Sequence, residues 1–277
     1  MIHYPYILHT HTNYCDGKHT PEKMVQAALA AGCKMIGFTE HSFVPFDPAG
    51  GMSPAQTAQY QADILALKEK YRNQIEIALG LEVDFYSPVQ DVVSLDYDIG
   101  AVHYLYKNGT YYSIDETPKK FEQCICALGG SIQMINAYYE TVIAMAQKRP
   151  AILAHFDLIT KFNHDSRYFS QNSLHYQKTA LKALEEAAKN NVVFEINTGA
   201  IARGWKDFPY PSPFLLHHLA KMDAPIIIST DTHCTEHLTF GINESLELLK
   251  EYGFKRILVY ENGNFLYYPL HSLPYHS

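Results

Sequence analysis

The residue type in this sequence with the greatest capacity for chemistry is histidine. The chain has 15 histidines among 277 residues, and histidine is the commonest metal ligand in proteins. The tripeptide His9-Thr10-His11 stands near the start, and Asp231-Thr232-His233 repeats its spacing far along the chain. Residues i and i+2 of a strand point to the same side, so each tripeptide can present two ligands together. Imidazole and carboxylate ligands without thiolate suit Zn, Fe, Mn or Co better than Mg or Ca.

More candidate ligands follow short apolar runs, which are typical of buried strands. The runs cover residues 6–8, 35–38, 75–79, 99–102, 151–154, 192–196 and 225–228. If these strands are parallel, their carboxyl ends meet on one face of the fold, where barrels of this kind carry their active sites. The polar residues at or after these ends are His9 and His11; Glu40 and His41; Glu82 and Asp84; His103; His155 and Asp157; Glu195, Asn197 and Arg203; and Asp231 and His233.

Helical patterns separate the runs, and four of them begin with a hydroxyl residue followed by proline: Thr20-Pro21, Ser53-Pro54, Thr117-Pro118 and Ser212-Pro213. The hydroxyl can cap a helix, and proline is favoured at the first helical position. Glycines at 32, 129–130 and 253 are read as helix ends. Seven strand–helix units in one domain's length predict an α/β fold, a single domain over residues 1–277 built as a closed or nearly closed TIM-like barrel. A C-terminal hairpin is expected around residues 261–264.

Composition narrows the class of protein. The chain has 22 Lys and Arg against 29 Asp and Glu, a net charge of −7 with no basic block, so we expect no nucleic-acid partner. It has no apolar run near the roughly 18 residues that a membrane span needs, and its first residues show no secretory signal. Five cysteines without regular spacing favour a reducing compartment. We therefore expect a cytoplasmic protein that contacts no membrane; its oligomeric state is left open.

An ordered set of segments through nearly the whole chain resembles the PHP (polymerase and histidinol phosphatase) superfamily, and within it the monofunctional histidinol-phosphate phosphatases. The resemblance implies a distorted (β/α)7 barrel, in agreement with the seven runs. The matching segments are His9-Thr10-His11-Thr12, Cys15-Asp16-Gly17, and residues 37–41, 80–84, 100–105, 154–159, 195–198, 210–212 and 229–233.

The resemblance also implies a centre of three divalent transition-metal ions (Zn, Fe, Mn or Co). By matching positions, the first ion would be held by His9, His11, Glu82 and Asp231, the second by Glu82, His103 and His155, and the third by Asp16, His41 and His233. Such a centre has a net positive charge, which suits a phosphate monoester dianion even in an acidic protein.

The implied activity is hydrolysis of L-histidinol phosphate to L-histidinol and phosphate, a step of histidine biosynthesis. A hydroxide bridging two of the metals would attack phosphorus, and Arg203 would bind phosphate oxygens through its guanidinium fork. Asp231 would orient the hydroxide and take its proton. His233 is one candidate donor of a proton to the leaving oxygen, and a metal-bound water is another.

Three other readings remain open at this point. The same chemistry could act on another small phosphomonoester or on a nucleotide 3′-end. A metal-dependent amidohydrolase also begins with H-x-H, but that class uses a lysine on the fourth strand, where this chain has His103. A metal-binding module without catalytic activity is the reading from a different class. Assays of phosphate release from the metal-loaded protein would separate these readings.

Overall fold

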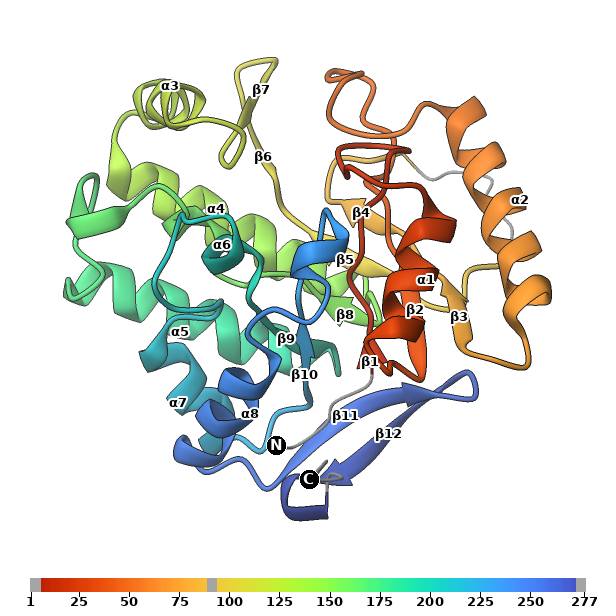
Figure 1. Cartoon of the computed structure of the whole chain (residues 1–277). Coiled ribbons are helices and arrows are strands. Elements are labelled where there is room, and N and C mark those ends of the chain that lie inside the picture. Colours follow the sequence, from red (N-terminus) through yellow and green to blue (C-terminus); the bar gives the residue numbers. More distant parts are fainter. Residues whose placement is uncertain (1–5, 89–93, 273–277) are drawn as a thin grey trace.

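The centre of the fold consists of short parallel strands in two sheets (Figure 1). In residues 6–88 and 94–272, which the computed structural model describes, one sheet has the order β1-β2-β3 and the other β10-β9-β8-β5-β4. All neighbours in these two sheets are parallel. The strands are β1 (Tyr6–Ile7), β2 (Met35–Phe38), β3 (Glu76–Leu79), β4 (Glu82–Asp84), β5 (Ile99–Ala101), β8 (Ile152–Leu153), β9 (Val193–Asn197) and β10 (Ile226–Ser229).

The strands come from the seven expected stretches of sequence. Every residue of β2, β9 and β10 is buried, as expected for parallel strands with helices on both faces. One correction concerns the third stretch, which continues beyond residue 79 and changes sheet to form β4. The change falls at Gly80, where a Cβ atom would lie 2.8 Å from Thr39 Cγ2. A residue with a side chain would therefore disturb the close approach of the two segments.

The two sheets approach each other on both sides. Thr10 forms a parallel bridge with Thr232, and His41 forms one with Glu82. The His11 amide donates to the Thr232 carbonyl at 2.8 Å, and the Thr232 amide donates to the His9 carbonyl at 3.1 Å. The hydrogen-bonded strands form two sheets rather than one closed sheet, so the architecture observed is a mixed α/β fold.

Helices surround the strands (Figure 1). They are α1 (Pro21–Ala30), α2 (Pro54–Tyr71), α3 (Pro118–Leu128), α4 (Ser131–Gln147), α5 (Leu174–Ala188), the short α6 (Gly199–Ala202), α7 (Pro213–Lys221) and α8 (Ile242–Glu251). No helix among the described residues is long and apolar enough to cross a membrane.

Four of these helices begin where the hydroxyl-proline pairs predict. Thr20, Ser53 and Thr117 accept hydrogen bonds from the backbone of the first turn, so their capping roles are confirmed. The expected cap at Ser212 is wrong: α7 does begin at Pro213, but the Ser212 hydroxyl bonds to the Asp157 carboxylate instead. Gly129 ends α3 in the left-handed conformation with φ 92°, as expected.

Two antiparallel hairpins complete the fold at opposite ends of the molecule (Figure 1). The expected C-terminal hairpin is confirmed as β11 (Arg256–Glu261) and β12 (Asn264–Pro269). The second hairpin, β6 (Tyr104–Lys107) and β7 (Thr110–Ser113), was not expected. Its turn is Asn108-Gly109, with φ of 49° and 84°, a sequence that favours two-residue hairpins. This second hairpin stands directly after His103.

Candidate metal centre

The strand ends bring the candidate ligands together around one carboxylate, that of Glu82. Its side chain is 1% exposed. Oε2 lies 2.8 Å from His41 Nδ1 and 3.5 Å from the Nε2 atoms of both His9 and His11. The other oxygen, Oε1, lies 3.0 Å from His155 Nε2 and 3.4 Å from His103 Nε2. Five imidazoles, from the ends of β1, β5 and β8 and from the segment after β2, therefore point at one acid.

Asp231 closes the buried side of the cluster. Its Oδ1 lies 3.4 Å from His11 Nε2 and 3.7 Å from His9 Nε2. The backbone at Asp231 is left-handed, with φ 44°, a conformation that costs a non-glycine residue roughly 1 kcal/mol or more. The adjacent Thr232 holds it in place through the backbone bonds to His9 and His11. This strained position directs the carboxylate toward the two histidines.

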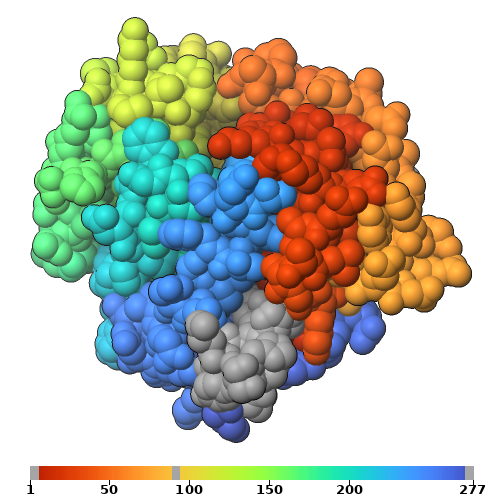
Figure 2. Space-filling view, in the orientation of Figure 1, coloured from red at the N-terminus to blue at the C-terminus, as the bar shows by residue number. Residues whose placement is uncertain are grey.

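Asp16, His41 and His233 form the outer side of the cluster. Asp16 Oδ2 lies 3.0 Å from His233 Nε2 and 3.8 Å from His41 Nε2. The side chain of Asp16 is 54% exposed, whereas that of His11 is fully buried. The Lys18 amide donates to the His233 carbonyl at 2.8 Å, and Figure 2 shows this N-terminal segment in red against the blue segment around residues 230–240. The cluster therefore opens to solvent on this side.

Gly17 allows the loop that carries Asp16 to lie close to the His9-Thr10-His11 segment. A Cβ atom at position 17 would be 2.6 Å from the carbonyl carbon and oxygen of His11. The loop therefore packs directly on the backbone of the H-x-H segment.

The side chains present fit divalent metal ions. Three fully buried atoms, His9 Nε2, His11 Nε2 and Glu82 Oε2, form no hydrogen bond with suitable angles among the described residues, although His41 Nδ1 lies 2.8 Å from Glu82 Oε2. A buried polar atom without a hydrogen bond costs roughly 1–3 kcal/mol, and three such atoms pointing at one place are suited to bind a cation. Groups whose donor atoms all lie within 4.8 Å of one another are His9, His11 and Asp231; His41, Glu82 and His103; and His11, Asp16, His41 and His233.

These groups differ in detail from the three expected ligand sets. His41 belongs to two of them, because its two ring nitrogens face Glu82 and Asp16 respectively. His155 is close to Glu82 Oε1 but belongs to none of the groups. A further group joins His11 with Cys15 and Glu40. There the Cys15 thiol and the Thr12 hydroxyl both donate to the buried Glu40 carboxylate, which supports a structural role for Glu40.

The electrostatics of the cluster differ from one histidine to another. Burial opposes protonation of His9, His41 and His103, but the neighbouring carboxylates raise the pKa of His9 and His41 well above its usual value and that of His103 to about 10, so metal binding at these rings would release protons. Burial together with the neighbouring His233 and His41 lowers the pKa of His11 to about 3, so that imidazole is neutral. Burial opposes the charge of Glu82, but His41, His103 and His9 hold the pKa of this carboxyl well below its usual range. Neutral imidazole and ionised carboxylate are the protonation states that metal binding requires.

Arg203 lies at the edge of the same cluster, at the end of α6. Its Nη2 lies 3.0 Å from Asp231 Oδ2, and its Nη1 lies 2.9 Å from His233 Nδ1. The side chain is 28% exposed, on the side where Asp16 and His233 also reach solvent. Gly199 gives it room, since a Cβ there would lie 2.9 Å from Asp231 Cβ and 3.0 Å from Arg203 Nη2. A guanidinium in this place can reach an anion at the cluster.

Glu195, for which the sequence suggested no role, lies directly behind the cluster. Oε2 of its buried carboxylate accepts from His9 Nδ1 at 3.1 Å and from the Ser229 hydroxyl at 2.6 Å. Oε1 accepts from the His155 amide at 2.7 Å and from Asn197 at 2.8 Å. A carboxylate that binds the far nitrogen of a ligand histidine fixes the ring's tautomer and orientation. The sequence feature that could have indicated this role is an acidic residue within an otherwise apolar strand.

Replacing Glu195 with glutamine is expected to lower the metal affinity and the activity roughly 10- to 100-fold. One acceptor oxygen becomes an NH2 group facing donors, so at least one of the four hydrogen bonds is lost. The control is Asp96→Asn, because Asp96 accepts from the Leu79 amide and pairs with Lys68, away from the cluster. Metal titration and steady-state kinetics check this. Equal metal affinities of Glu195→Gln and wild type would show that Glu195 does not support the metal ligands.

Asp84 and Asp157, each two residues beyond a candidate ligand, behave differently. Asp84 Oδ2 accepts from the His103 amide at 2.9 Å and lies 3.5 Å from His103 Nδ1, so it supports the ligand beside it. Asp157 instead accepts from the amide and hydroxyl of Ser212. It therefore anchors the segment before α7 and not His155.

A parallel α/β fold with imidazoles and carboxylates converging at its strand ends is the arrangement found in metal-dependent hydrolases. The chain belongs to the PHP domain family, whose model matches residues 8–199. This result confirms the resemblance found in the sequence.

Relatives in this family have similar lengths. The chain is 26% identical over 263 residues to the histidinol-phosphatase of Bacillus subtilis, covering 86% of this chain and 97% of the relative. It is 28% identical over 266 residues to the probable histidinol-phosphatase of Deinococcus radiodurans, covering 90% and 94%.

Solved structures show the same fold. The putative histidinol phosphatase hisK from Listeria monocytogenes matches with a TM-score of 0.75 at 20% identity, over 86% of this chain and 98% of that one. Histidinol phosphate phosphatase from Lactococcus lactis, complexed with Zn, L-histidinol and phosphate, matches with a TM-score of 0.70 at 20% identity, over 95% and 99%.

Proposed function

We propose that this chain is a metal-dependent histidinol-phosphatase, which hydrolyses L-histidinol phosphate to L-histidinol and phosphate in histidine biosynthesis. The observation that carries the proposal is the convergence of buried ligand atoms of His9, His11 and Glu82 that form no hydrogen bond. The names of the family relatives direct it to this substrate, as does the bound L-histidinol and phosphate in the Lactococcus lactis protein.

In this proposal three divalent transition-metal ions (Zn, Fe, Mn or Co) are bound by His9, His11, Asp16, His41, Glu82, His103, His155, Asp231 and His233. When bound, such ions act as Lewis acids that lower the pKa of water and polarise a phosphoryl group. Glu82 is the shared ligand, since both of its oxygens face imidazoles. Glu195 and Asp84 hold His9 and His103 in orientation.

The remaining roles belong to residues on the open side. Arg203 binds oxygens of the phosphate and stabilises the charge that spreads over them in the transition state. Asp231, held ionised by Arg203 and His9 despite its burial, which opposes the charge, accepts a proton from the attacking water. His233, 19% exposed beside Arg203, and a water at the open side of the cluster are the two candidate proton donors to the leaving oxygen.

We also propose that the two sheets form one distorted (β/α)7 barrel and that residues 1–277 are a single domain. The bridges Thr10–Thr232 and His41–Glu82, which join the two sheets, support this architecture. The five cysteines are free thiols, which favours a reducing compartment such as the cytoplasm.

Replacing Arg203 with alanine is expected to lower kcat/KM about 100- to 1000-fold, mainly by weakening phosphate binding. The inhibition constant of inorganic phosphate should rise with it. Arg167→Ala is the matched control, because Arg167 is exposed and pairs with Glu122 on the surface. Unchanged phosphate inhibition in the Arg203 variant would show that this guanidinium does not bind substrate.

The proposal as a whole is tested by measuring phosphate release from a panel of monoesters with protein reloaded with Zn, Mn, Fe or Co. We expect the highest kcat/KM with L-histidinol phosphate. Preference for another small phosphomonoester or for a nucleotide 3′-phosphate would support the proposed phosphatase chemistry but contradict the proposed substrate. No phosphate release from any ester would favour a metal-binding module without catalysis.

A further inference from the structure

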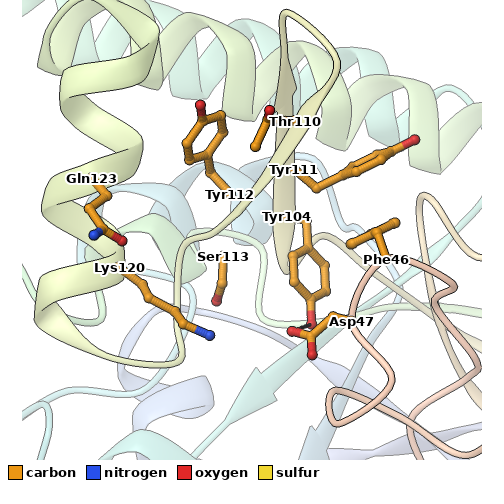
Figure 3. A pocket seen from close by; sticks show the side chains of 9 residues that line it. All are labelled: Phe46, Asp47, Tyr104, Thr110, Tyr111, Tyr112, Ser113, Lys120 and Gln123. Carbon is orange, nitrogen blue, oxygen red and sulfur yellow. Dashed lines mark hydrogen bonds between the residues drawn. The ribbon is translucent and has the colours of Figure 1, made fainter.

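A pocket of about 390 Å³ lies between the β6–β7 hairpin, α3 and the loop that follows His41 (Figure 3). This volume is in the range of small-molecule sites. Figure 3 shows Phe46, Asp47 and Tyr104 gathered on one side and Lys120 on the other. The lining residues are Phe46, Asp47, Tyr104, Thr110, Tyr111, Tyr112, Ser113, Lys120 and Gln123.

Three separate segments connect this pocket to the candidate metal centre. Tyr104 directly follows the candidate ligand His103. After the pocket residue Ser113, the Ile114 amide donates to the His103 carbonyl at 3.0 Å. The loop carrying Phe46 and Asp47 begins at His41 and returns to it, where the Met52 amide donates to the His41 carbonyl at 3.0 Å. The pocket and the candidate metal centre are therefore built on the same two stretches of backbone, residues 41–52 and 103–114.

The walls of the pocket are flat and aromatic. The rings of Phe46 and Tyr111 stack with centroids 3.7 Å apart and planes 7° apart, and Tyr104 meets Phe46 edge-on at 5.0 Å. Aromatic faces of this kind favour planar rings and cations. The opposite wall has Lys120, whose charge is paired with Glu116.

One acid stands among these rings. The Tyr104 hydroxyl donates to Asp47 Oδ2 at 2.9 Å. Asp47 Oδ1 accepts no hydrogen bond from any residue within 6–88 and 94–272, and the side chain is half-buried. A half-buried carboxylate oxygen beside aromatic faces is suited to accept from the N–H of a planar nitrogen heterocycle.

We propose that this pocket binds the imidazole ring of the substrate, with Asp47 accepting its N–H and the rings of Phe46 and Tyr104 contacting its edge and face. The proposal rests on the proposed function, because L-histidinol phosphate carries such a ring at the end opposite its phosphate. Phosphate held at Arg203 and the metal centre and imidazole held at Asp47 would fix both ends of one molecule.

The test compares Asp47→Asn with Tyr104→Phe. Asparagine keeps an acceptor for the Tyr104 hydroxyl but removes the charge, whereas Tyr104→Phe removes the internal hydrogen bond and keeps the charge. Calorimetric titration with L-histidinol measures the ring-binding end without catalysis. We expect Asp47→Asn to weaken L-histidinol binding roughly 10- to 100-fold, the loss of one charge-assisted hydrogen bond, and to raise the KM for L-histidinol phosphate more than it lowers kcat. Tyr104→Phe should weaken binding by less than about 5-fold.

Glu261→Gln is the matched control, because Glu261 also accepts from a tyrosine hydroxyl, that of Tyr268 at 2.8 Å, on the distant β11–β12 hairpin. Equal losses in Asp47→Asn and Tyr104→Phe would mean that Asp47 only anchors Tyr104, and would overturn the inference. Unchanged L-histidinol binding in Asp47→Asn, with wild type active on L-histidinol phosphate, would overturn it and leave the proposed function intact. A wild-type protein inactive on that ester would instead refute the proposed function.

Discussion

Replacing Glu82 with glutamine is expected to lower phosphatase activity by roughly 1000-fold or more, since the loss of a shared metal site removes several kcal/mol of transition-state stabilisation. The carboxylate lies within 3.5 Å of ring nitrogens of His9, His11, His41, His103 and His155. An amide has one acceptor oxygen and no charge, so it cannot serve all of them. Steady-state kinetics with the metal-loaded variant measure the effect.

Glu76→Gln is the control for this change. Glu76 begins β3, on the same segment of chain, and its carboxylate accepts from the amides of Asn262 and Gly263. A second readout is the thermal shift on adding metal. Ligand at 100 times its Kd stabilises a folded protein by about 2.7 kcal/mol, and the Glu82 variant should gain much less than wild type. A Glu82→Gln protein with wild-type activity and wild-type metal response would contradict the assignment of Glu82.

Removing metal with a chelator is expected to abolish phosphate release, and adding back Zn, Mn, Fe or Co should restore it. In the proposed mechanism water, and not a cysteine, serine or threonine side chain, attacks phosphorus. The attack therefore depends on water activated at the cluster. Activity is measured after dialysis against chelator and again after titration with each ion. The titration also gives the number of ions bound, for which we expect three.

The stripped protein should keep its fold, because the buried apolar side chains of β2, β9 and β10 do not depend on the ligand atoms. Circular dichroism before and after stripping provides this control. If the fold were lost as well, the loss of activity could not be attributed to the loss of metal. Only samples with an unchanged spectrum are therefore compared. Full activity in such a folded, metal-free sample would rule out the mechanism.

Much of the fold could be predicted because its signals are local. Threonine or serine before proline marked the starts of α1, α2, α3 and α7, and Gly129 marked the end of α3. The convergence of histidines and acids followed from strand direction, since parallel strands that start together also end together. The metal-binding roles of these side chains remain predictions.

Other features could not be predicted because they depend on pairs of residues far apart in sequence. Glu195 meets His9 across 186 positions, and nothing in either segment indicates that contact. Ser212 resembles a cap, but its hydroxyl is directed to the Asp157 carboxylate, 55 positions earlier, and accepts from no amide of the first turn of α7. The β6–β7 hairpin did have a local signal in Asn108-Gly109, but the run of tyrosines around it lacks clear alternation.

We expect imidazoles and carboxylates that are distant in sequence to bind catalytic ions together at one end of the fold. The most direct measurement is anomalous X-ray diffraction from crystals of the metal-loaded protein, recorded at the absorption edge of the added metal. We predict anomalous peaks among His9, His11, Glu82 and Asp231, beside His103 and His155, and beside Asp16, His41 and His233. A map with no anomalous peak within coordination distance of these side chains would contradict the account.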